Sequence, residues 1–121
     1  MTRENILIDK CVNFAVRTVN CYRYLANTQK EFVMSKQMYR SGTSIGANLH
    51  EGLQAQSRPD FVSKLSIALK EANETSYWLV ILRRTNYLSE VQYVSLKTDL
   101  DEIIRILIAS IKTTKKNMQY E

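Results

Sequence analysis

Apolar residues recur at alternating intervals of four and three along the chain, a spacing that keeps one side of an α-helix apolar. Three segments, residues 4–26, 59–85 and 90–115, show this pattern without interruption. We expect each segment to be a helix with its stripe facing a common core. The stripe residues are Ile8, Val12, Ala15, Val19, Tyr22 and Ala26, then Phe61, Leu65, Ala68, Ala72, Thr75, Leu79 and Leu82, and finally Tyr93, Leu96, Leu100, Ile103, Leu107 and Ser110.

A fourth helix is expected over residues 30–53, although its centre consists almost wholly of small residues. Its apolar positions are Phe32, Met38, Ile45 and Leu49. Gly42 and Gly46 also lie in this interior, where each glycine costs about 1 kcal/mol relative to alanine. We therefore predict that the backbone of a neighbouring helix passes close to the two glycines.

The breaks between these segments are short and carry signals for helix starts. Pro59 has the fixed φ suited to a first helical turn, and Ser89 with Gln92 three residues later forms a capping-box pattern. Long helices joined by short breaks must double back. The sequence thus predicts an all-α protein, a single domain over residues 1–121, built as an antiparallel up-down-up-down four-helix bundle about 35–40 Å long.

Composition favours a helical fold, and the absence of targeting and membrane-spanning patterns favours a cytoplasmic protein. The 121 residues include only 3 Gly and 1 Pro, too few for the turns of an all-β protein. Cys11 and Cys21 are ten residues apart on one predicted helix, about 15 Å along its axis, so they should not form a bridge. The charged N-terminal segment is unlike a signal peptide, and no apolar run approaches the roughly 20 residues of a membrane helix. We expect a cytoplasmic protein with no membrane contact.

Catalytic and metal-binding patterns are weak. Gly42-Thr43-Ser44-Ile45-Gly46 matches the G-x-S-x-G of a hydrolase nucleophile elbow, but that motif requires a preceding strand and an independently placed histidine. His50, the single histidine, falls on the same predicted helix as Ser44. Two cysteines ten residues apart and a single histidine do not supply the four ligands of a tetrahedral metal site. We expect no catalytic residues, no metal, no cofactor and no small-molecule substrate.

The net charge of +5 suggests a polyanionic partner. Basic residues recur every seven positions in the first predicted helix, where they are expected to face outward, and a second cluster lies near the chain end. We predict that these side chains contact RNA or DNA phosphates, although ordinary solubilising charge would give the same pattern. The predicted nucleic-acid-binding residues are Arg3, Lys10, Arg17, Arg23, Lys30, Lys112, Lys115 and Lys116.

Two predicted helices carry more apolar residues than a single bundle requires. Contiguous apolar surface of this kind usually marks an interface, so we expect a homo-oligomer. A wider core that buries the same residues is the alternative. The predicted interface residues are Trp78, Ile81, Ile104, Ile108 and Ile111. In a second functional hypothesis, these faces recruit a protein partner such as a polymerase, and the positive charge is incidental.

One set of residues in the second predicted helix carries a family resemblance. The set comprises Arg40, Ser44, Asn48, Glu51 and Gly52. With the segment from Phe61 to Leu79, it resembles the bacterial four-helix-bundle proteins encoded within intervening sequences of 23S ribosomal RNA genes. The chain is also similar to the accessory variability protein of diversity-generating retroelements, a pentameric basic barrel that associates with a reverse transcriptase and nucleic acid. The resemblance implies a homo-oligomer, possibly pentameric, with a basic nucleic-acid-binding surface.

Overall fold

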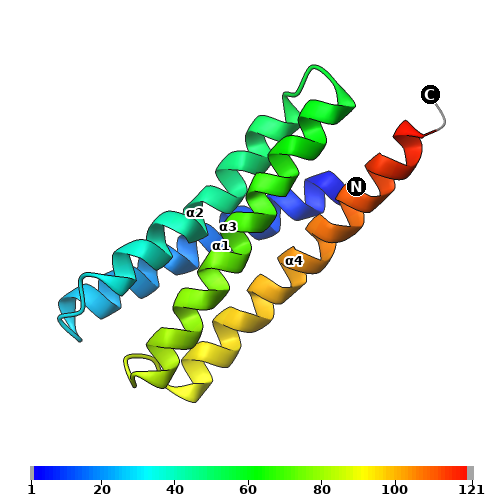
Figure 1. The fold of residues 1–121 in the computed structure, drawn as a ribbon. Coiled ribbons are helices and arrows are strands. Elements are labelled where there is room, and N and C mark those ends of the chain that lie inside the picture. Colours follow the sequence, from blue (N-terminus) through cyan, green and yellow to red (C-terminus); the bar gives the residue numbers. More distant parts are fainter. Residues whose placement is uncertain (1, 120–121) are drawn as a thin grey trace.

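Four helices make up almost all of the computed structural model, which describes residues 2–119. They are α1 (Arg3–Asn27), α2 (Met34–Leu53), α3 (Arg58–Arg84) and α4 (Glu90–Met118). Successive helices run in opposite directions (Figure 1). Each helix packs against its neighbours in sequence, and α1 also packs against α4, so α1 and α3 lie on one diagonal of the bundle. The predicted all-α four-helix bundle is confirmed.

The start of α2 differs from the prediction by four residues. Lys30 has a φ of 56°, in the left-handed region, so the chain turns here instead of beginning a helix. The buried Glu31 carboxylate then accepts hydrogen bonds from the backbone N–H groups of Val33, Met34 and Ser35, at 3.0, 3.1 and 2.7 Å. Because the first N–H groups of a helix have no partner within it, this carboxylate satisfies donors that would otherwise be unpaired.

The other helix starts follow the sequence signals. The Ser57 hydroxyl accepts the backbone N–H of Asp60, next to Pro59. Ser89 and Gln92 form the predicted capping box: the Gln92 backbone N–H donates to the Ser89 hydroxyl at 3.1 Å, and the Ser89 N–H donates to the Gln92 side-chain oxygen at 2.8 Å.

The core stripes of α3 and α4 are confirmed. In α1 the predicted Ala26 is buried, but the other buried positions lie one residue earlier than predicted. The buried residues of α1 are Leu7, Cys11, Phe14, Thr18, Leu25 and Ala26. Val12, predicted to be buried, is 52% exposed. The reason is that α1 carries two adjacent apolar stripes, separated by the 100° between consecutive residues. Phe32, also assigned to the core, is 57% exposed because it lies in the turn before α2.

The glycines of α2 explain this rotation of α1. A Cβ atom on Gly42 would lie 2.6 Å from Cγ2 of Thr18, and one on Gly46 would lie 3.2 Å from Cβ of Cys11. Thr18 and Cys11 therefore pack directly against the backbone of α2. The predicted close approach at these glycines is confirmed, with α1 as the neighbour.

We expect Gly42→Ala to destabilise the protein by about 1–3 kcal/mol, as overpacking usually does, although alanine favours an isolated helix. Thr18→Ser removes the Cγ2 atom that the new methyl group would meet. The double variant should therefore lose less stability than the two single changes added together. Urea denaturation of the four proteins measures this coupling, and strictly additive losses would contradict the proposed contact.

Glu31→Gln should destabilise the protein by about 1–2 kcal/mol near neutral pH, because a neutral amide replaces the carboxylate cap. Burial acts to raise the pKa of Glu31, but the hydrogen bonds from the backbone N–H groups of Ser35, Met34 and Val33, with one from the Ser35 side chain, outweigh it and lower the pKa from its usual 4.5.

The sign of the pH dependence follows from this lowered pKa. The carboxylate stabilises the fold fully above its unfolded-state pKa, and the stabilisation is lost as the pH falls through the lower folded-state pKa. The difference between wild type and Glu31→Gln should thus shrink in acid. Urea denaturation at several pH values tests this, with Glu51→Gln at an exposed ion pair as the control. A difference that does not change with pH would contradict the assigned role of Glu31.

Candidate nucleic-acid and partner surfaces

Three of the predicted nucleic-acid-binding residues lie at the contact between α1 and α4. Arg17 donates to Asp99 at 2.6 Å, and also to the backbone oxygen and hydroxyl of Ser95 at 3.1 and 2.7 Å. Lys10 forms an ion pair with Glu102, with Nζ and Oε1 2.8 Å apart.

Arg3 extends the same row of contacts toward the end of the bundle. Its guanidinium donates to the Thr113 hydroxyl at 3.2 Å. Arg3, Lys10 and Arg17 thus lie along the flank of α1 next to α4 and not on its outermost face. Arg3 is exposed, and the side chains of Lys10 and Arg17 keep 34% and 35% of their surface exposed, so nucleic-acid binding by these residues stays a prediction. The rotation of α1 that displaces its apolar stripe also turns these side chains toward α4.

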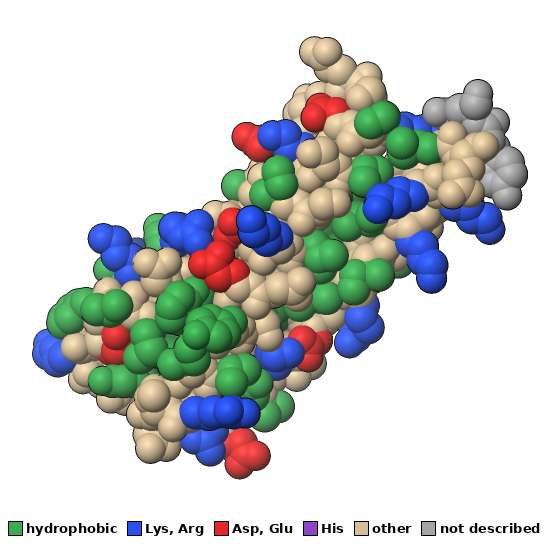
Figure 2. All heavy atoms as spheres, viewed as in Figure 1, with side chains coloured by type: hydrophobic (Ala, Val, Ile, Leu, Met, Phe, Trp, Pro, Cys, Tyr) green, Lys and Arg blue, Asp and Glu red, His purple; other side chains and the backbone are tan. Residues whose placement is uncertain are grey.

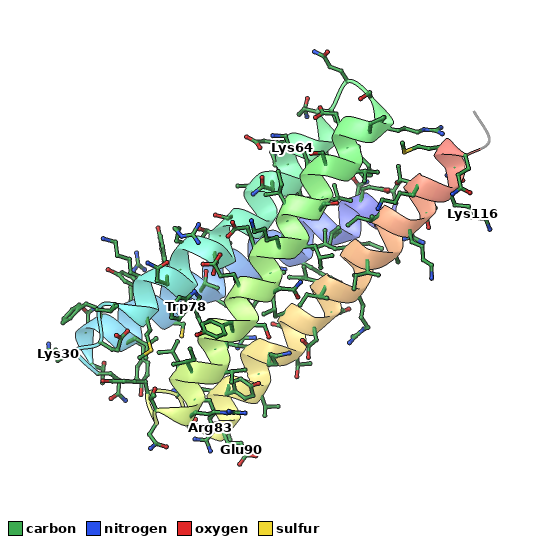
Figure 3. The ribbon with its side chains drawn as sticks, in the orientation of Figure 1. Lys30, Lys64, Trp78, Arg83, Glu90 and Lys116 are labelled. Atoms are coloured by element: carbon green, nitrogen blue, oxygen red, sulfur yellow. The ribbon has the colours of Figure 1, made fainter. Side chains whose placement is uncertain are left out.

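The other five predicted cations are exposed. Within residues 2–119, no ion-pair or hydrogen-bond partner is present for Arg23, Lys30, Lys112, Lys115 or Lys116. Arg105 is also exposed and has no such partner among these residues. The sequence analysis did not include it, although it precedes Lys112 by the same seven-residue interval that relates the basic residues of α1. Lys and Arg side chains follow the outer edge formed by α4 (Figure 2), and Lys116 projects from its last turns (Figure 3).

The family motif lies largely at the contact between α2 and α3. Arg40 donates to Glu74 at 2.7 Å, and its guanidinium is 3.6 Å from Glu71. Trp78 donates its indole N–H to Glu74 at 3.4 Å. Glu71 Oε2 is buried without a hydrogen-bond partner among the described residues. The cluster therefore holds two acidic side chains of α3 against one arginine of α2.

The remaining motif residues bond within α2 or contact α3. The Ser44 hydroxyl donates to the backbone oxygen of Arg40, and the Asn48 amide donates to that of Ser44, at 2.7 and 2.8 Å. Glu51 accepts from Lys64 of α3 at 3.3 Å. A Cβ atom on Gly52 would lie 3.0 Å from Leu65. These contacts give the motif a packing role.

The five predicted interface residues do not share one environment. Trp78, Ile104 and Ile111 are half-buried against the core, Ile81 is half-buried, and Ile108 is 48% exposed. Because Trp78 bonds to the glutamate that pairs with Arg40, it lies on the flank of α3 nearest α2 (Figure 3). Ile104, Ile108 and Ile111 instead share one side of α4, as their spacing of four and three requires.

An apolar groove of about 860 Å³ runs between α1 and α2 on the outside of the bundle. From α1 it is lined by Ile8, Val12, Val16 and Val19, and from α2 by Gly46 and Ala47, with polar side chains at its rim. The sequence analysis did not predict this groove, because it placed Ile8, Val12 and Val19 in the core. A second apolar stripe of α1, which begins one residue earlier at Leu7, is the one that faces the core, and it leaves the first stripe to line the groove.

The hydrolase-like motif has no elbow geometry. Gly42, Ser44 and Gly46 all lie inside the continuous helix α2, and the Ser44 hydroxyl donates to the backbone oxygen of Arg40. Burial raises the pKa of Cys11 to about 12 and that of Cys21 to about 11, with Arg17 lowering the latter in part. Both thiols therefore stay protonated at neutral pH, the unreactive form.

Neither a cluster of metal ligands nor a membrane-spanning helix is found among residues 2–119. No three His, Cys, Asp or Glu side chains there come together in a way that could hold a metal ion. Among the same residues, no helix combines the length and apolarity needed to cross a membrane.

Comparison with known proteins identifies the family. The model of the 23S rRNA-intervening sequence proteins matches residues 3–109. This chain belongs to that family. A crystal structure from Bacteroides thetaiotaomicron VPI-5482, described as a protein with unknown function from the S23 ribosomal protein family, is 59% identical, with a TM-score of 0.91. The alignment covers 92% of this chain and 99% of the other. No match was found among curated proteins.

The contacts between α1 and α4 predict that the Arg17 side chain stabilises the folded protein. Arg17→Ala should lower the free energy of unfolding by about 1 kcal/mol, since it loses an ion pair and two further hydrogen bonds. A double-mutant cycle with Asp99→Ala should show coupling, whereas Arg23→Ala, at an exposed arginine of the same helix, should change stability by less than about 0.5 kcal/mol. Thermal or urea denaturation measures both, and equal effects at the two arginines would contradict the assignment.

Proposed function

We propose that this family member is a non-catalytic, oligomeric protein of the cytoplasm that binds the phosphates of RNA or DNA through its exposed cations. The observation that carries this proposal is the charge of the last turns of α4. Between Glu102 and Glu121 the sequence contains four basic residues and no Asp or Glu. Three of the four, Lys112, Lys115 and Lys116, fall within five residues of one another and are exposed.

Phosphate binding by these lysines needs no base-specific geometry. Lysine ammonium groups neutralise backbone phosphates and release bound counterions, a mode that depends on charge density and not on sequence. Lys10 and Arg17 contribute less to this surface, because each already has an acidic partner on α4. The exposed lysines of α4 therefore support a nucleic-acid-binding surface on this helix, with Arg3 beside it, Arg23 near the opposite end of α1 and Lys30 in the turn that follows α1.

The test is a fluorescence-anisotropy titration with a structured RNA and with duplex DNA at several salt concentrations. Affinity should fall as salt rises, with a log-log slope set by the number of phosphates contacted. The triple change Lys112→Gln, Lys115→Gln and Lys116→Gln should weaken binding and make the slope shallower by about 2–3, since each lost contact contributes about 0.7–0.9.

A matched control removes the same three charges elsewhere on the surface. Lys36, Lys70 and Arg84 are exposed on α2 and α3, and their joint replacement by Gln leaves the net charge of the control equal to that of the α4 variant. The control should bind more tightly than the α4 variant. Equal weakening would show that overall charge alone governs binding, and an absence of binding at low salt would refute the nucleic-acid function.

The second candidate function, recruitment of a protein partner through apolar surface, has one observation in its favour. The α1–α2 groove is open and almost wholly apolar along its α1 side. If a nuclease-treated pull-down from the host returned a protein whose capture is lost with Val12→Glu, recruitment would be favoured over phosphate binding.

A further inference from the structure

The turn between α1 and α2 exposes two apolar side chains to water. Phe32 is 57% exposed and Val33 is 73% exposed. The backbone of this turn is fixed by the left-handed conformation of Lys30 and by three N–H groups at the start of α2, which donate to the buried Glu31 carboxylate. A ligand can therefore bind the Phe32 ring without the entropic cost of ordering a mobile loop.

A second exposed aromatic ring lies near the same end of the bundle. Tyr39 of α2 is 38% exposed, and its ring contacts that of Tyr22 on α1, with the ring centroids 5.2 Å apart. This contact limits the rotation of the Tyr39 side chain. Tyr39 follows Phe32 by seven residues, a rise of about 10 Å at 1.5 Å per residue. Two rings with fixed positions are thus exposed close to the α1–α2 turn.

The segment that carries these rings is strongly basic. Between Asp9 and Glu51 the sequence contains six Lys and Arg residues and one acidic residue, Glu31, which is buried. Three of the six cations pair with carboxylates of α3 or α4. Within residues 2–119, the other three are exposed and have neither an ion-pair nor a hydrogen-bond partner; they are Arg23, Lys30 and Lys36. Lys and Arg side chains lie next to hydrophobic ones at this end of the molecule (Figure 2).

Exposed aromatic rings beside cations without partners are the features that bind single-stranded nucleic acid. Every base has a π face that can stack on a phenylalanine or tyrosine ring, and Lys and Arg side chains neutralise the neighbouring phosphates. The bases of a duplex are stacked on one another and cannot use such rings. The lysines of α4 differ in this respect: residues 94–119, which include them, contain no aromatic residue, so no base can stack on a ring there.

We propose that the end of the bundle at the α1–α2 turn binds unpaired nucleotides of single-stranded RNA or DNA. One base stacks on Phe32, Tyr39 offers a second ring, and Arg23, Lys30 and Lys36 hold the phosphates on either side. Lys30 and Lys116 lie at opposite ends of the bundle, so this site is separate from the lysines of α4 (Figure 3). The inference rests on the proposed nucleic-acid function and assigns unpaired bases to this end.

The test is a fluorescence-anisotropy titration with a short oligouridylate, which forms no duplex, and with a short duplex RNA. Phe32→Ala should weaken oligouridylate binding about fivefold or more, as the loss of one base-stacking ring usually does, and should leave duplex binding unchanged. Phe32→Tyr keeps the ring and should keep the affinity. Phe32→Leu keeps an apolar side chain without a ring and should lose affinity as Phe32→Ala does.

Two controls separate stacking from apolar contact and from overall charge. Val33→Ala removes exposed apolar surface next to Phe32 but no ring, so it should bind both nucleic acids as the wild type does. The joint change Arg23→Gln and Lys30→Gln should make the log-log salt slope for oligouridylate shallower by about 1.4, at about 0.7 per phosphate contact of a single strand. Lys70→Gln with Arg84→Gln removes the same charge from exposed positions of α3 and should change the slope less.

Other outcomes overturn the inference in distinguishable ways. If the wild type binds the duplex but not oligouridylate, or if Phe32→Leu binds oligouridylate as the wild type does, unpaired bases do not stack at this turn, and phosphate binding by α4 stands. If neither nucleic acid binds at low salt, both proposals fail. All variants should keep the wild-type circular dichroism spectrum and urea midpoint, because Phe32 is exposed. If Phe32→Ala does not, Phe32→Leu against Phe32→Tyr carries the comparison.

A membrane surface is the other partner that apolar side chains beside cations can contact. The apolar surface at the turn itself is confined to Phe32 and Val33, much less than a helix face that binds at a membrane, so the observations favour nucleotides. Sedimentation with phosphatidylglycerol vesicles decides between them. If the wild type and Phe32→Leu sediment with the vesicles, and Phe32→Ala binds oligouridylate as the wild type does, the turn contacts lipid and the inference is wrong.

Discussion

The close contact between α1 and α2 at the two glycines sets the rotation of α1, and much of the surface depends on that rotation. With no Cβ on Gly42 or Gly46, Thr18 and Cys11 pack against the backbone of α2. Once these two residues face α2 and the core, every other position of α1 has a fixed direction. A larger residue at position 42 would have to push α1 outward or turn it.

Two consequences of this rotation concern function. The flank carrying Arg3, Lys10 and Arg17 turns toward α4, where acidic and hydroxyl side chains engage it. The stripe carrying Val12 and Val16 turns outward and forms one wall of the groove. The rotation of α1 thus places three predicted nucleic-acid-binding residues beside α4, and it exposes Val12, which was predicted to lie in the core.

Several residues of the family motif make contacts between α2 and α3. Arg40 joins two glutamates of α3, and Gly52 allows Leu65 to approach α2. At the same time, the glycines that resemble a hydrolase elbow are on the α1 side of the same helix. One helix therefore carries the contacts to two neighbours, which is why its centre has so few large residues.

The sequence by itself determined the helical fold, the number and approximate limits of the helices, and the core positions of α3 and α4. Periodicity is sufficient for this because those two helices carry one dominant buried stripe. Periodicity did not give the start of α2. That start depends on a turn at Lys30 and on the capping role of Glu31, and no pattern in the sequence indicates this turn. Only the tertiary structure decided which of the two stripes of α1 is buried, because adjacent stripes satisfy the periodicity equally and the choice depends on the glycines of a neighbouring helix. It also decided which cations are free, since an ion pair depends on the helix that lies opposite.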